Sequence, residues 1–119
     1  MAETKWRFRE VEFQSEGASM RGRLYTPRRF LRPLPGVVMA HGFSATITMT
    51  IDHYAEVICS KGFAVLLYDH RNFGSSDGEP RRHINPWLQA RGYRDALSYL
   101  DGLGEVDSSR LGIWGDSAS

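Results

Sequence analysis

Residues 115–119 read Gly-Asp-Ser-Ala-Ser and have the types and spacing of a covalent catalytic site. The pattern G-x-S-x-S is a variant of the nucleophile elbow G-x-S-x-G, in which a serine hydroxyl attacks a carbonyl carbon. Small residues are needed two positions before and after the serine, because the turn from strand to helix is too tight for larger ones. We therefore expect Ser117 to be a nucleophile; a plain Gly/Ser turn is the alternative.

A second candidate element comes earlier, in the sequence His41-Gly42-Phe43-Ser44. In acyl transfer, the negative charge that develops on the carbonyl oxygen needs preorganised N–H donors. Gly42 allows the backbone to turn and to offer the N–H of Phe43, and the residue after the nucleophile, Ala118, offers the other N–H. We expect His41 to be a buried histidine bonded to this loop rather than a catalytic base.

Three short apolar runs are expected to form the strands that position these residues: 36–40, 63–68 and 111–114. Apolar runs without alternation are typical of strands buried on both faces, as in a parallel sheet. Before them, the runs 6–13 and 19–25 flank Gly17 and predict an antiparallel hairpin. The apolar phase of the first run shifts between Phe8 and Val11, which predicts a β-bulge there.

Two helices are expected between the buried strands. One would present an apolar face to the sheet, which would bury Cys59, and would end at Gly62. That face consists of Ile51, Tyr54, Ala55, Ile58 and Cys59. The other would begin with Asn85 as N-cap and Pro86 as first helical residue. Its expected apolar stripe consists of Ala90, Tyr93, Leu97 and Leu100. The order predicts one α/β domain over residues 1–119, with a doubly wound, mostly parallel sheet.

The segments "PGVVMAHGFSA", "GFAVLLYDHRNFGSSDGEP" and "VDSSRLGIWGDSAS" resemble the N-terminal half of α/β hydrolases, most closely the dienelactone-hydrolase-like and peptidase-like acyl hydrolases. This resemblance implies a Ser-acid-His triad with Ser117 as nucleophile and with Phe43 and Ala118 at the oxyanion-hole positions. It implies no metal or organic cofactor. Dienelactone hydrolases have cysteine at the elbow, so the serine here favours esters, thioesters or amides as substrates.

In that family the acid and the histidine follow the nucleophile, whereas every histidine and acidic residue here precedes Ser117. We therefore expect a missing C-terminal half to supply them, and we expect residues 1–119 alone to be inactive. The predicted activity is ester or thioester hydrolysis on a small molecule through an acyl-enzyme. A peptidase of the same fold and a non-catalytic relative acting as a binding module are the alternatives.

Other polar residues are interpreted as structural. Asp69-His70-Arg71 could be an acid-base pair, but the resemblance implies a structural loop in which Asp69 and Arg71 tie backbone and neighbouring loops together. Asp116 should support the elbow or face solvent. His53 falls on the polar side of its helix, and His83 lies in a loop that could reach a pocket rim. The pairs Arg28-Arg29 and Arg81-Arg82 are interpreted as solvated loop charge.

Composition excludes several classes of function. The net charge of +1 gives no field that would attract nucleic acid. A single cysteine and the absence of a visible signal peptide favour a reducing, cytoplasmic location. No apolar run approaches the roughly 18 residues that span a bilayer, so no membrane partner is expected. The sequence leaves the oligomeric state open.

Overall fold

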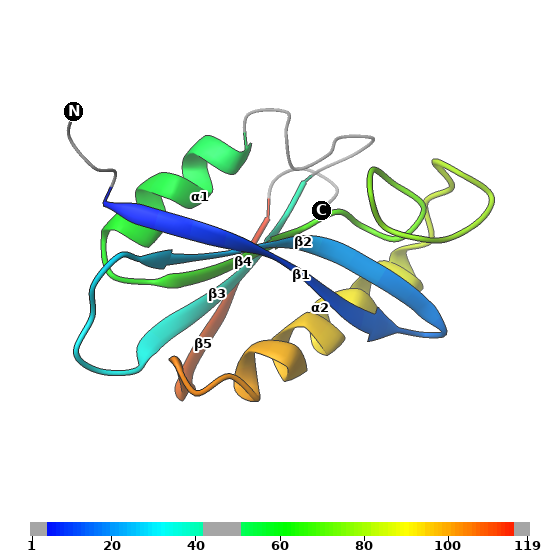
Figure 1. Cartoon of the computed structure of the whole chain (residues 1–119). Coiled ribbons are helices and arrows are strands. Elements are labelled where there is room, and N and C mark those ends of the chain that lie inside the picture. Colours follow the sequence, from blue (N-terminus) through cyan, green and yellow to red (C-terminus); the bar gives the residue numbers. More distant parts are fainter. Residues whose placement is uncertain (1–4, 42–50, 116–119) are drawn as a thin grey trace.

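The computed structural model describes residues 5–41 and 51–115, which form a mixed sheet with two helices (Figure 1). The sheet has five strands in the described residues, in the order β1-β2-β4-β3-β5. The strands are β1 (Trp6–Ser15), β2 (Ala18–Pro27), β3 (Leu34–Ala40), β4 (Ala64–Tyr68) and β5 (Val106–Gly115). The helices are α1 (Ile51–Ser60) and α2 (Pro86–Asp101). The α/β sheet with an N-terminal hairpin is as predicted.

The hairpin has a two-residue turn at Glu16-Gly17, with φ of 46° and 78°. Positive φ at both turn positions is the geometry that matches the twist of a tight hairpin. Pairing between β1 and β2 is antiparallel and continuous, from Trp6 opposite Pro27 to Ser15 opposite Ala18. The bulge predicted between Phe8 and Val11 is therefore wrong.

The shifted apolar phase of β1 arises because both faces of the sheet are covered. Near its start, Trp6 packs with Tyr25 on the side of α1, and its ring stacks with that of Phe8. Further along, Val11 and Phe13 pack on the side of α2. A strand that contributes to two cores in turn changes its apolar face without any extra residue.

The three strands β3, β4 and β5 are parallel, and their carboxyl ends lie level. Ala40 at the end of β3 is opposite Tyr68 of β4 on one side and Gly115 of β5 on the other. The connection from β3 to β4 contains α1, and the connection from β4 to β5 contains α2. The two helices cover opposite faces of the sheet (Figure 1).

Helix α1 buries Ile51, Ala55 and Cys59 and ends before Gly62, whose φ is 102°. Burial also raises the pKa of the Cys59 thiol to about 12. The prediction for Tyr54 is wrong, because this side chain is 56% exposed. Its ring stacks on Trp114 of β5, with ring centroids 6.1 Å apart, at the edge of the sheet rather than under it.

Helix α2 begins as predicted, with the Asn85 side chain accepting hydrogen bonds from the N–H groups of Trp87 and Leu88. The predicted stripe is shifted, because Gly92, Ala96 and Leu100 are the buried positions and Ala90 is exposed. Gly92 explains the shift. A Cβ there would lie 3.1 Å from the Tyr68 hydroxyl, so the glycine lets the helix approach β4 closely.

Candidate active site

The carboxyl edge of the parallel strands is where the sequence-predicted site residues begin. His41 follows β3 directly, Asp69 and His70 follow β4, and Gly115 ends β5. Ligands bind α/β sheets outside the carboxyl ends of strands whose connections leave toward opposite faces. The connections after β3 and β4 leave toward opposite faces in this way, so this edge is where the fold is expected to place a site.

The main predicted chemical residues lie outside the described residues: Ser117, Ala118, Gly42 and Phe43. Their predicted roles stay predictions. Of the proposed set, the structure describes His41, which is half-buried at the end of β3. The fold brings the strand that leads to Phe43 beside the strand that leads to Ser117.

Asp69 has the structural role that the sequence predicts. Its side chain is buried, and Oδ2 accepts hydrogen bonds from the N–H and the hydroxyl of Ser75, each at 3.0 Å. The Ser76 hydroxyl donates to the Asp69 carbonyl at 2.5 Å. Gly74, with φ of 52°, passes so close that a Cβ there would lie 2.3 Å from Oδ2. The carboxylate therefore organises the loop after β4.

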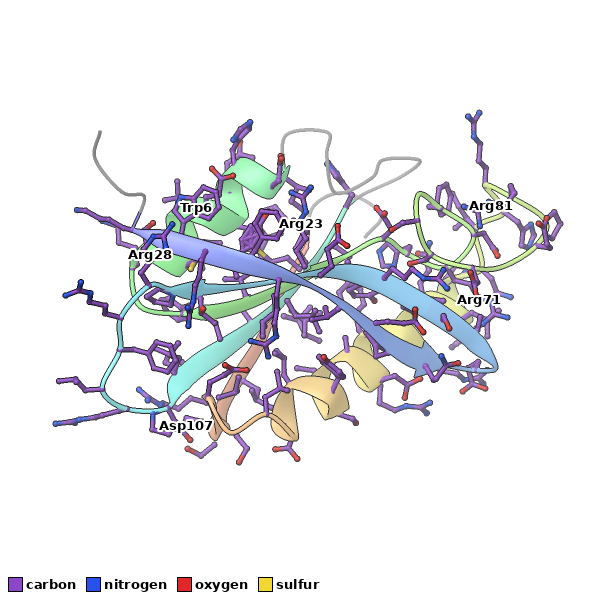
Figure 2. All side chains as sticks on the ribbon, viewed as in Figure 1. Trp6, Arg23, Arg28, Arg71, Arg81 and Asp107 are labelled. Carbon is purple, nitrogen blue, oxygen red and sulfur yellow. The ribbon has the colours of Figure 1, made fainter. Side chains whose placement is uncertain are left out.

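Two arginines hold the same loop in place (Figure 2). Arg71 donates to the carbonyls of Ser15 and Glu16, each at 3.1 Å, which ties the loop to the hairpin turn as predicted. Arg81 donates to three carbonyls of the loop itself, those of Gly74, Ser76 and Gly78. Arg81 is an exposed loop residue, as predicted, and in addition backbone carbonyls of the folded loop converge on its guanidinium.

His70 was expected only as part of a structural loop, and its burial was not predicted. It is a deeply buried titratable group at this edge, together with its neighbours Tyr68 and Asp69. Its side chain is 4% exposed and packs edge-to-face on the rings of Tyr68 and Tyr93, with centroids 5.6 and 5.3 Å away. Burial lowers the pKa of His70 to about 4, and the nearby backbone of His41 opposes this shift. The imidazole is therefore neutral at pH 7. Neither ring nitrogen makes a hydrogen bond of good geometry to the described residues, and the backbone of His41 is the polar group that acts on the ring.

The other two histidines lie away from this cluster. His53 is on the exposed side of α1, with Nδ1 3.5 Å from a Glu56 carboxylate oxygen. His83 is exposed, and its carbonyl accepts a hydrogen bond from the Asn72 side chain at 2.9 Å. Within the described ranges, no group of three or more His, Cys, Asp or Glu residues could hold a metal ion. No helix in those ranges is long and apolar enough to cross a membrane.

Comparison with known proteins agrees with this architecture. No protein-family model matches the chain. The chain is 41% identical over 113 residues to thiohydrolase aneE of Aspergillus aculeatus, a match that covers 94% of the chain and 35% of that relative. It is 40% identical over 117 residues to acyltransferase drtE of Aspergillus calidoustus, covering 98% of the chain and 37% of that relative.

The crystal structure of the α/β hydrolase GrgF from Penicillium superposes with a TM-score of 0.84 and 30% identity. That match covers 92% of this chain and 37% of GrgF. The chain belongs to the α/β-hydrolase superfamily. The described residues thus carry the hairpin and the first parallel strands of an α/β-hydrolase sheet. The chain spans about a third of the length of the curated relatives that it matches.

Proposed function

We propose that the complete protein is a serine-dependent acyl hydrolase that cleaves a small-molecule ester or thioester. One observation carries the proposal: β3 and β5 are neighbours, and Ala40 lies opposite Gly115 at their carboxyl ends. Phe43 and Ser117 follow these two positions by three and two residues. A donor for the oxyanion and a nucleophile would therefore start from adjacent strand ends, as acyl transfer needs.

In the proposed reaction, the Ser117 hydroxyl attacks the substrate carbonyl and gives its proton to a histidine from the part of the protein that follows Ser119. The N–H groups of Phe43 and Ala118 hold the resulting oxyanion. The tetrahedral intermediate collapses, the alcohol or thiol leaves with that proton, and an acyl-enzyme remains. Water then attacks the acyl carbonyl, the same histidine takes its proton, and the carboxylic acid is released as Ser117 is regenerated.

The names of two relatives support acyl chemistry of this general kind, one as a thiohydrolase and one as an acyltransferase. The second name favours one further candidate, in which the acyl group passes to an acceptor other than water. Incubating the acyl-enzyme with and without small alcohols and amines separates the two, because a transferase forms the new ester or amide in preference to the acid. We also propose a cytoplasmic location, because Cys59, the one cysteine among these 119 residues, is a free and buried thiol.

Ser117→Ala in the complete protein tests the proposal. Loss of a triad nucleophile costs on the order of 10⁶ in kcat, so turnover of an activated thioester should fall to background. Ser119→Ala is the matched control, since it removes a hydroxyl from the same pentapeptide and should keep turnover. A fluorophosphonate should label the wild type and the control at Ser117. Turnover by Ser117→Ala close to that of the wild type would exclude this serine as the nucleophile.

A further inference from the structure

The charges of the chain are distributed unevenly along the sheet, although the net charge is only +1. The end where β3, β4 and β5 begin is formed by residues 5–9, 27–35, 60–63 and 101–110, and we call it the basic end. It contains eight of the 15 Lys and Arg residues but three of the 14 Asp and Glu residues, so its net charge is +5. The remaining seven cations and eleven acids leave the rest of the chain at −4. Figure 2 shows Arg28 at the basic end, far from Arg71 and Arg81.

Two of the three acids at the basic end are already neutralised by neighbours. Glu105 is paired with Arg9 at 2.5 Å, and Asp107 is paired with Arg110 at 2.8 Å. Five further cations are exposed and have no ion pair with another described residue: Lys5, Arg7, Arg29, Arg32 and Lys61. Like charges gathered in this way create a local positive potential that attracts an anionic partner.

The loop between β2 and β3 carries an apolar side chain among these cations. Leu31 is 103% exposed, so its side chain contacts almost nothing in the protein. Its neighbour Phe30 is half-buried against the core on the side of α2, whereas Arg29 and Arg32 on either side are exposed. One exposed leucine is common on a protein surface and carries no meaning alone. Its place at the tip of a loop, between unpaired arginines, is the informative feature.

Both ends of this loop are fixed by hydrogen bonds to other segments. The N–H of Arg28 donates to the carbonyl of Lys5 at 3.2 Å, at the start of the loop. At its end, the N–H of Leu34 donates to the carbonyl of Glu105 at 2.9 Å. A loop that is already ordered loses little conformational entropy when its tip binds a partner. The backbone therefore presents Leu31 to a partner without having to rearrange.

We propose that the basic end is a peripheral docking surface for anionic phospholipid membranes, with Leu31 inserted below the headgroups and the arginines among them. Insertion of apolar groups and attraction to anionic lipids are the two contributions that give a peripheral protein its membrane affinity. The cytoplasmic leaflet carries the negative surface potential that such a surface needs. Protein interfaces are instead centred on packed aromatic anchors, which this loop tip lacks.

The expectation of no membrane partner rests on the lack of a spanning run, which peripheral docking does not need. Docking through the basic end would also leave the candidate active site open, because that site lies at the carboxyl edge, at the other end of the parallel strands. The docked protein would then take its substrate from solution. The inference does not depend on the proposed function, and vesicle binding measures it without any turnover.

Sedimentation of the complete protein with vesicles tests the proposal. The protein should bind vesicles of phosphatidylserine and phosphatidylcholine in equal parts, and should not bind vesicles of phosphatidylcholine alone. Each arginine near an anionic surface contributes a factor of about five, so Arg29→Ala with Arg32→Ala should lower the partition coefficient by about 25-fold. Leu31→Gln keeps every charge but removes the inserted group, and should lower the coefficient by about ten-fold.

A matched control removes the same charge elsewhere. Arg91 and Arg94 lie on α2 beside Glu16 of the hairpin turn, with guanidinium nitrogens 3.9 and 3.1 Å from its carboxylate. Arg91→Ala with Arg94→Ala should bind the mixed vesicles as the wild type does. The Tm of each variant is measured as a check on folding, and Leu31→Gln should leave it unchanged because the side chain is fully exposed.

Each outcome decides the matter. Absence of binding to the mixed vesicles, or equal binding to both kinds of vesicle, would refute the proposal. Equal losses in the two arginine pairs would mean that net charge alone drives binding, which contradicts a specific basic end. Full binding by Leu31→Gln would refute insertion of the loop tip. A complete protein that binds polyglutamate but not the mixed vesicles would have an acidic protein as its partner instead of a membrane.

Discussion

Burial of His70 should make the stability of the complete protein depend on pH within a defined window. The ring is 4% exposed, and its pKa falls from 6.5 to about 4 on folding. Between these two values the unfolded chain binds a proton at this residue and the folded protein does not. The free energy of unfolding therefore decreases as the pH is lowered from about 6.5 to about 4. Above and below that window the contribution of His70 does not change with pH.

The size of the effect follows from the two pKa values. Each pH unit between them corresponds to about 1.4 kcal/mol, so a gap from 6.5 to about 4 predicts a loss of about 3 kcal/mol. Domains are usually stable by about 5–15 kcal/mol, so this one imidazole would account for a large share of acid destabilisation. Phenylalanine at this position has no proton to bind and keeps a ring in the same space.

Urea unfolding followed by circular dichroism, at intervals from pH 7.5 to pH 4, measures this dependence for the wild type and for His70→Phe. The difference between the two stability curves should change by about 3 kcal/mol across the window, in the direction that favours His70→Phe at low pH. Val38→Ala is the control, because a fully buried side chain that does not titrate should shift stability equally at every pH. A difference that stays flat from pH 7 to pH 4 would refute the reasoning.

Two further predictions concern the sheet. A Cβ at Gly22 would lie 2.1 Å from the Leu67 carbonyl oxygen, so Gly22→Ala should push β2 away from β4. We expect thermal unfolding to show a loss of stability of about 1–3 kcal/mol. Gly104→Ala, with no atom within 4 Å, should leave the Tm nearly unchanged. Residues 1–119 expressed alone should show neither cooperative unfolding nor thioester turnover, because β5 is an open edge and Ile113 is 54% exposed there. A folded, active monomer would contradict this.

The sequence by itself determined which segments form strands and helices. The apolar runs 36–40, 63–68 and 111–114 lie within β3, β4 and β5 apart from one residue at the start of β4. Asn85-Pro86 marked the first turn of α2, and Gly17 marked the hairpin turn. These features are local, because capping, turn geometry and apolar runs depend on residues that are close in the chain. The predicted roles of Ser117, Phe43 and Ala118 also rest on local motifs.

Only the tertiary structure decided which side chains are covered. Tyr54 has the spacing of a core residue yet lies at the sheet edge, and His70 follows a strand within a polar tripeptide yet is buried. Arg81 is an exposed loop charge, as predicted, and it also binds three carbonyls of its own loop. In the first two cases the deciding neighbours, Trp114 and Tyr93, come from elements distant in the sequence. Burial depends on which strands and helices become neighbours in space, and periodicity within one segment carries no information about that.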